Sequence, residues 1–169
     1  MKNSLSVGNE AKIGGLNVTS ATQAIGWSGL VAGVLDAIAG VIVFYIFFGM
    51  DPFQVLQFIA SGVFSPTAIN GGFLMILAGT VFHFFIAYVV AVIYFLAYPK
   101  IQLLQNQKVI MGLLYGLGIW LVMNLLILPY SNTPKNPFDI NVAAVGIIWH
   151  MVLVGLPIAL ITAKHYDSK

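Results

Sequence analysis

Residues 72–98 read GFLMILAGTVFHFFIAYVVAVIYFLAY, and His83 is the only Asp, Glu, Lys, Arg or His residue among them. An α-helix rises about 1.5 Å per residue, so about 20 apolar residues cross the hydrocarbon core of a bilayer. Residues 72–98 exceed this length and carry no permanent charge. We therefore predict that they form a membrane-spanning helix.

Three further stretches have the same character, and the composition of the whole chain agrees with them. The chain is 60% hydrophobic and only 7% charged, whereas soluble domains carry about 25% charged residues. Its mean hydropathy is +0.97. The three stretches are IGWSGLVAGVLDAIAGVIVFYIFFG at 25–49, VIMGLLYGLGIWLVMNLLILP at 109–129 and VAAVGIIWHMVLVGLPIALITA at 142–163.

These four spans predict an all-α fold, an integral-membrane four-helix bundle, because backbone polar groups in lipid must be bonded within the protein. We expect one membrane domain at 25–164, with polar tails at 1–24 and 165–169. The first tail has no apolar core after its basic start, so it is expected to be a retained, solvated tail and not a secretory signal.

The lysines indicate an orientation. The chain has seven Lys or Arg residues, and all seven are lysines. Positive residues accumulate on the cytoplasmic side of membrane proteins, which predicts that both termini are cytoplasmic. Six of the lysines fall on one side of the predicted bundle and Lys135 falls on the other; the six are Lys2, Lys12, Lys100, Lys108, Lys164 and Lys169.

The first outer segment, DPFQVLQFIASGVFSPTAIN at 51–70, is too short to span but carries apolar side chains at loosely helical spacing. We predict a short interfacial helix on the extracytoplasmic leaflet. The alternative is a re-entrant element or a lid over the bundle. The second outer segment, 130–141, is polar with two prolines and is interpreted as a surface turn.

Each span contains one polar residue that shares a helical stripe with small residues. The polar residues are Asp36, His83, Asn124 and His150. Small residues let membrane helices approach closely, and polar side chains bond across such contacts. We therefore predict an inward-facing polar cluster near the membrane midplane. The predicted helix-packing glycines are Gly29, Gly33, Gly40, Gly79, Gly112, Gly116 and Gly146.

Protonation is the chemistry that this cluster suggests. A charged side chain at the bilayer centre costs about 3 kcal/mol or more unless it is paired or neutralised. If Asp36 faces His83 or His150, the two groups can share a proton and titrate together. The alternative is that Asp36 is a neutral, hydrogen-bonded packing element.

The two histidines leave three interpretations open. His83 and His150 each follow a glycine four residues earlier. Facing each other at similar depth, they could bind a haem iron axially, or hold another metal together with Asp36. Hydrogen-bonded core histidines are the third interpretation. The chain contains no cysteine, which excludes disulfides and thiolate-bound clusters.

Pro157 marks a break in the fourth span. Proline has no N–H, so the carbonyl of Leu153 loses its helical donor. We predict a kink at this point. The alternative is that the freed carbonyl lines a water-filled site.

Several stretches together resemble a broad group of small bacterial four-span inner-membrane proteins with no assigned activity. The resemblance covers about residues 26–163 and implies a four-helix fold in a bacterial inner membrane. It supplies no substrate, cofactor or catalytic residue. The stretches are GLVAGVLD (29–36), DPFQVLQFIASGVFS (51–65), INGG (69–72), HFFIA (83–87), GLLYG (112–116), MNLLILP (123–129), and His150 followed by GLPIA (155–159).

The function that these observations favour is transport or conduction of a proton or small solute through the midplane site. An accessory or scaffold protein that contacts other membrane proteins is the alternative, and a haem or metal protein is the second. We expect no enzyme, because no nucleophile–base pair or phosphate-binding loop is present. The expected partners are the lipid bilayer and either a second copy or other membrane proteins. The sequence has no basic stripe that would bind nucleic acid.

Overall fold

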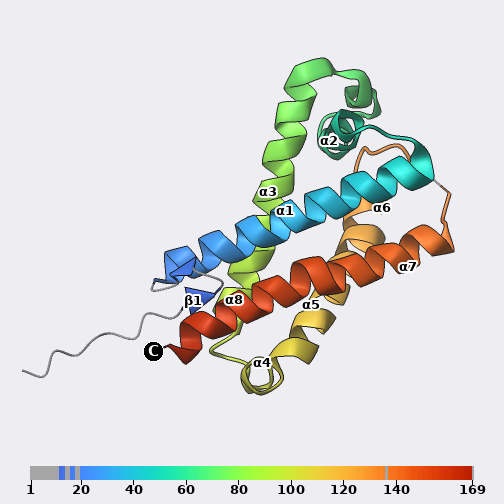
Figure 1. Ribbon diagram of the computed structural model, residues 1–169. Helices are drawn as coiled ribbons and strands as arrows, with labels where there is room; N and C mark the ends of the chain where they lie inside the picture. The colour runs from blue at the N-terminus through green and yellow to red at the C-terminus, as the bar shows by residue number, and fades with distance from the viewer. Residues whose placement is uncertain (1–11, 14–15, 18–19, 136, 169) are drawn as a thin grey trace, which may run out of the picture.

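The computed structural model describes residues 12–13, 16–17, 20–135 and 137–168, and its fold is all-α (Figure 1). Within these residues, four helices are long and apolar enough to cross a membrane. The predicted four-helix membrane fold is confirmed, and the chain is a multi-pass membrane protein. The four helices are Ala21–Phe48, Gly72–Ala97, Lys108–Tyr130 and Ile140–Asp167.

The first helix, α1 (Ala21–Phe48), begins four residues before the predicted start at residue 25. The cause is a capping box. The Ser20 side chain accepts a hydrogen bond from the Gln23 N–H, and the Gln23 side chain accepts one from the Ser20 N–H. The last four residues of the tail predicted at 1–24 are therefore helical. A two-residue antiparallel pair, β1 (Lys12–Ile13) with β2 (Leu16–Asn17), precedes α1; residues 1–11, 14–15 and 18–19 lie outside the described residues.

The third and fourth spanning helices each contain a π turn. The third consists of α5 (Lys108–Val122), the π segment η2 (Met123–Ile127) and α6 (Leu128–Tyr130). The fourth consists of α7 (Ile140–Trp149), the π segment η3 (His150–Gly155) and α8 (Leu156–Asp167).

Both π turns end directly before a leucine–proline pair, which contains Pro129 in one helix and Pro157 in the other. Because proline lacks an N–H, the ordinary i to i−4 pattern cannot continue through it, and the wider turn accommodates the missing donor. The break predicted at Pro157 is thus a π turn. Helix α8 also continues to Asp167, beyond the predicted end of the span at residue 163 and into the tail predicted at 165–169.

The first outer segment folds as α2 (Pro52–Ser61), followed by the 3-10 helix η1 (Pro66–Asn70). Asp51 caps α2 by accepting hydrogen bonds from the N–H groups of Phe53 and Gln54. Helix α2 packs across α3 (Gly72–Ala97), and a Cβ atom on Gly79 would collide with the Leu56 carbonyl oxygen. Helix α2 therefore lies against the side of the bundle as well as at one end of the bundle.

The second outer segment is also attached to α2. The Asn132 N–H donates to the Gly62 carbonyl oxygen at 3.1 Å, directly after the last residue of α2. Thr133 is buried beside it. The predicted surface turn is in fact a docked loop that fixes the end of α2.

Helix α1 occupies the centre of the arrangement. It packs against α3 on one side and against η3 and α8 on the other, and these two elements pack in turn against α5. The starts of α1 and α5 and the ends of α3 and α8 lie at one end of the bundle, which we call the lysine-rich end. The opposite end, which carries α2, is the α2 end.

Six of the seven glycines that were predicted to pack helices make close contacts in the structure, and Gly40 is the exception. Gly29 and Gly33 of α1 lie against aromatic side chains of α3, and Gly146 of α7 lies against Trp120. Gly40 differs, because a Cβ atom there would meet nothing within 4 Å. The prediction that Gly40 packs helices is wrong, since α1 faces a cavity at this position.

The outside of the bundle is apolar. Large side chains such as Ile46, Phe85, Leu125 and Ile148 are each more than 60% exposed. Such a surface would be very unfavourable in water and suits contact with lipid tails. The four helices therefore present the surface of a protein that lies in a bilayer.

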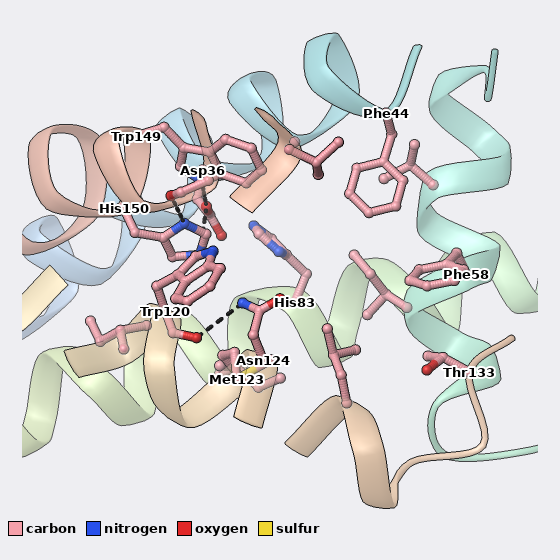
Figure 2. A pocket seen from close by; sticks show the side chains of 18 of the residues that line it. Asp36, Phe44, Phe58, His83, Trp120, Met123, Asn124, Thr133, Trp149 and His150 are labelled. Atoms are coloured by element: carbon pink, nitrogen blue, oxygen red, sulfur yellow. Dashed lines mark hydrogen bonds and ion pairs between the residues drawn. The ribbon is translucent and has the colours of Figure 1, made fainter. Parts of the chain in front are cut away.

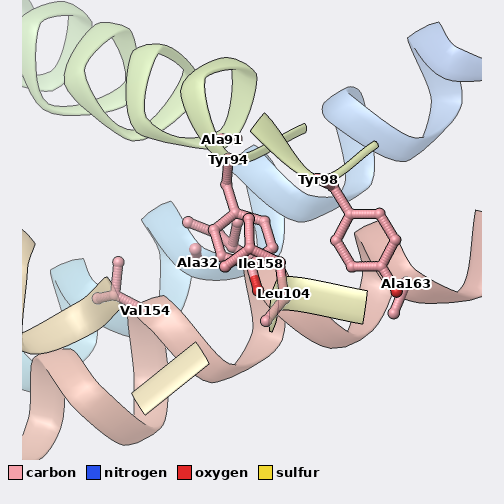
Figure 3. Close-up of a cluster of buried hydrophobic side chains, with 9 residues drawn as sticks. Ala32, Ala91, Tyr94, Tyr98, Leu104, Val154, Ile158 and Ala163 are labelled. Atoms are coloured by element: carbon pink, nitrogen blue, oxygen red, sulfur yellow. The ribbon is translucent and has the colours of Figure 1, made fainter. Parts of the chain in front are cut away.

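The best-packed core lies toward the lysine-rich end (Figure 3). Tyr94 and Tyr98 of the α3 end pack there with Ile158 of α8, and all three side chains are at most 2% exposed. Ala32 of α1 and Val154 of η3 belong to the same cluster. This layer closes the bundle on that side.

Candidate functional site

A cavity of about 560 Å³ lies between the helices on the α2 side of this core. Its walls come from α1, α2, α3, α5, η2, α6, α7, η3 and the loop before α7. All four predicted polar residues line it: Asp36, His83, Asn124 and His150. Figure 2 shows their side chains around the same space.

Asp36 contacts two neighbouring residues of the fourth spanning helix. Its Oδ1 atom accepts a hydrogen bond from Trp149 Nε1 at 2.8 Å. The same oxygen lies 3.7 Å from His150 Nε2. The Asp36 side chain is 27% exposed and that of His150 is 12% exposed. The pair is therefore sheltered by protein but still reachable from the cavity.

The hydrogen bond on the other side of the His150 ring fixes its tautomer. His150 Nδ1 lies 2.7 Å from the Gly146 carbonyl oxygen. A carbonyl oxygen can only accept, so Nδ1 carries the hydrogen. In a neutral ring Nε2 then has a lone pair, which faces the Asp36 carboxylate. Two hydrogen-bond acceptors then face each other, which is unfavourable unless one of them carries a proton. The geometry therefore forms a site for one proton.

His83 is held by a different helix. Its Nε2 lies 2.7 Å from the Gly33 carbonyl oxygen of α1, and by the same argument this nitrogen carries the hydrogen. The bond joins α3 to α1 three residues before Asp36. Nδ1 of the neutral ring remains as an acceptor.

Asn124 lines the cavity from the second residue of η2. Its side-chain amide donates to the Trp120 carbonyl oxygen, four residues earlier, at 3.0 Å. The structure thus brings Asp36 and His150 into direct contact. His83 and Asn124 line the same space and form their hydrogen bonds with backbone carbonyls.

The arrangement bears on the haem and metal interpretations. His83 Nε2 is occupied by the Gly33 carbonyl, so the usual ligating nitrogen of this ring is engaged. Among the described residues, no group of three His, Cys, Asp or Glu side chains is placed to hold a metal ion. The donor set near Asp36 fits a proton or an N–H donor better than a metal, which prefers several ligands.

Two tryptophans belong to the site although the polar pattern did not select them. Trp149 donates to Asp36, and Trp120 lies against Gly146. Trp149 follows Gly146 by three residues and so shares its side of the helix. This spacing could have identified Trp149 as a residue on the inward side of the helix.

Two further charged residues line the cavity, and both are bonded locally at the α2 end. Lys135 Nζ donates to the carbonyl oxygens of Leu128 at 2.6 Å and Ser131 at 2.7 Å. Asp139 caps α7, since its Oδ1 accepts hydrogen bonds from the N–H groups of Asn141 and Val142. Asp36, His83 and His150 are therefore the ionisable groups in the depth of the cavity.

The cavity extends from the core around Tyr94 and Tyr98 to the α2 end, and several of its lining side chains are exposed. Val90 and Val154 line its floor, and the Tyr115 hydroxyl donates to the Val90 carbonyl oxygen at 2.6 Å beneath it. At the α2 end the lining includes Phe138, which is 79% exposed.

Comparison of this chain with protein-family models, with curated proteins and with solved structures gave no match. The function is therefore argued from the geometry of the cavity.

Proposed function

We propose that this protein moves protons across a membrane through the Asp36–His150 pair, either alone or in exchange for a small solute. The observation that supports the proposal most directly is the 3.7 Å approach of His150 Nε2 to Asp36 Oδ1 in a cavity midway along the spanning helices. Ionisable residues within membrane spans are costly and usually mark ion or substrate pathways.

The architecture fits such a role. We infer that the pair is reached from the α2 end, because Phe138 lines the cavity there and is 79% exposed, whereas the packed core around Tyr94 and Tyr98 lies toward the lysine-rich end. A transporter must expose its site to one side of the membrane at a time, and this arrangement corresponds to one of the two states. The lid interpretation of the first outer segment also fits, because Phe58 of α2 lines the cavity and packs 5.5 Å from Phe44 of α1, ring to ring.

The membrane and the orientation are part of the proposal. The lysine-rich end carries Lys100, Lys108 and Lys164, whereas Lys135 lies at the other end. The positive-inside rule then places the lysine-rich end and both termini in the cytoplasm and opens the cavity to the outside. The resemblance to small bacterial inner-membrane proteins supports that membrane. The residues that line the cavity all come from one chain.

Proton flux into proteoliposomes tests the proposal. Purified protein is reconstituted with a pH-sensitive dye inside, and a potassium diffusion potential drives protons inward. We expect flux above that of empty liposomes, reduced at least about tenfold by Asp36→Asn, because the amide can neither bind the extra proton nor hold a charge.

The matched control is Asp167→Asn. Asp167 forms an ion pair with Lys108 at 2.5 Å on the exposed lysine-rich end, away from the cavity. This variant should conduct as the unmodified protein does. Flux that Asp36→Asn and His150→Gln both leave unchanged would overturn the proposal, and a protein with no flux at all would favour the accessory or scaffold role.

A further inference from the structure

The Asp36–His150 pair can accept hydrogen bonds from a ligand in place of its proton. When no proton lies between them, Asp36 Oδ1 and His150 Nε2 are two acceptors 3.7 Å apart. A nitrogen that carries two hydrogens can lie about 2.9 Å from each of them and donate to both. The ligand group that suits two acceptors next to a carboxylate is an ammonium, because it carries hydrogens and compensates the negative charge.

The other titratable groups of the cavity do not compete for this position. Among its lining residues they are His83, Lys135 and Asp139. His83 presents an acceptor nitrogen to the cavity, since its Nε2 hydrogen is used on Gly33. Lys135 and Asp139 are bonded to backbone groups at the α2 end. The deep part of the cavity therefore has acceptors and one net negative group when the pair has lost its proton.

The walls define the remainder of the ligand. Trp120, Trp149, Phe44 and Phe58 line the cavity together with aliphatic side chains. Aromatic faces attract a cation by about 0.5–2 kcal/mol, more when water is excluded. The cavity volume of about 560 Å³ lies within the range of about 300–1,000 Å³ typical for small-molecule sites. An apolar body attached to the ammonium would fill this space.

We propose that the substrate class of this site is a lipophilic ammonium, which binds with its N–H groups on Asp36 and His150 and displaces the proton that they hold. This inference depends on the proposed function for its role in transport, while the binding itself does not. Ammonium and proton exclude each other from the pair. One proton is therefore released for each ammonium that enters, and an inward proton gradient would drive the cation outward.

Calorimetric titration of the purified protein tests the binding. The probe is 2-phenylethylammonium. Two matched probes separate charge from hydrogen bonding: 2-phenylethanol has the same body without the charge, and trimethyl(2-phenylethyl)ammonium keeps the charge but has no N–H group. We expect the primary ammonium to bind at least about tenfold more tightly than either, since only it supplies both features.

The pH dependence of ammonium binding tests whether a proton is released. Because one proton leaves as one ammonium binds, the dissociation constant of the ammonium should fall about tenfold for each unit by which the pH is raised. This holds over the range in which the free pair is protonated. Titrations in buffers with different ionisation enthalpies should give a release close to one proton per ammonium.

Two variants test whether the Asp36 carboxylate binds the ammonium. Asp36→Asn should weaken ammonium binding at least tenfold and abolish the proton release. Asp167→Asn is the matched control, since it makes the same exchange at a carboxylate outside the cavity lining, where Asp167 pairs with Lys108; it should bind as the unmodified protein does. If Asp36→Asn does not purify as a folded protein, His150→Gln takes its place, because glutamine cannot take up the proton.

The outcomes separate this inference from the proposed function. Equal binding of the quaternary and primary ammonium, or unchanged binding by both Asp36→Asn and His150→Gln, overturns the inference. If liposomes show Asp36-dependent proton flux but the primary ammonium does not bind, the inference fails and the transport proposal stands. If the ammonium binds with release of one proton and no flux occurs, the ligand site stands and the transport proposal fails.

Discussion

Gly116 of α5 lies directly against the backbone of His150, so a Cβ atom on Gly116 would collide with the His150 carbonyl oxygen and lie 2.6 Å from the Met151 Cα atom. The third and fourth spanning helices thus touch backbone to backbone at the residue that contacts Asp36. The same contact continues one turn away, where a Cβ atom on Gly112 would lie 2.7 Å from the Ala159 Cβ atom. The position of the His150 ring is therefore set by glycines that have no polar role.

Gly116→Ala should destabilise the protein by about 1–3 kcal/mol, because the added methyl group meets backbone atoms that cannot move aside. Gly118→Ala is the control, since a Cβ atom there meets nothing within 4 Å. Alanine favours a helix over glycine by up to about 1 kcal/mol, so Gly118→Ala should be neutral or slightly stabilising. Thermal unfolding in detergent measures both, and equal midpoints for the two variants would contradict the close contact.

Gly79→Ala should loosen α2. The new methyl group would meet the Leu56 carbonyl oxygen, so α2 must move away from α3 and from the cavity that it covers. The chain has no cysteine, which allows a single Met123→Cys reporter inside the cavity. We expect a water-soluble thiol reagent to label this cysteine several-fold faster when Gly79→Ala is present. Gly40→Ala, which adds a methyl group in open space, should leave the rate unchanged.

The apolar runs and the glycine spacing were sufficient to predict the four helices and the inward side of each. Hydrophobic length determines which segments cross a membrane, and residues at i and i+4 necessarily share a side of a helix. This is why the Gly33 and Gly116 contacts could be anticipated. Gly40 occupies the same stripe as Gly33 and does not pack, because periodicity gives the side of a helix but not the position at which its neighbour diverges.

The partners within the site could not be predicted in the same way. Which histidine reaches Asp36 depends on the crossing of α1 with the fourth helix, and that crossing depends on contacts far apart in the sequence. His83 lies at a similar depth but bonds to the Gly33 carbonyl. The π turn at His150 could not be predicted from the sequence either. Pro157 indicates that a backbone donor is missing, but not how the preceding turn of the helix adjusts.

The proposed orientation predicts that cysteines introduced at Asn70 and Asn106 are labelled from opposite sides of the membrane. Asn70 ends η1 at the α2 end, and Asn106 ends α4 (Gln102–Asn106) at the lysine-rich end; both are exposed. In intact cells, a membrane-impermeant maleimide should label Asn70→Cys. Asn106→Cys should react only after the membrane is opened. The reverse pattern would invert the orientation and place the cavity opening in the cytoplasm.

Trp149→Phe should weaken the site without removing its ionisable groups. The change keeps an aromatic ring but deletes the N–H that donates to Asp36 Oδ1 at 2.8 Å. Hydrogen bonds between membrane helices contribute about 0.6 kcal/mol on average and up to about 1.7 kcal/mol, so we expect a loss of about 1 kcal/mol in unfolding free energy. Proton flux should also fall, because the carboxyl group loses the contact that orients it toward His150. Trp27→Phe makes the same exchange at the lysine-rich end of α1, outside the cavity lining. If both variants lowered stability and flux equally, the effect would come from loss of indole packing in general, and the assigned role of the Trp149–Asp36 bond would be refuted.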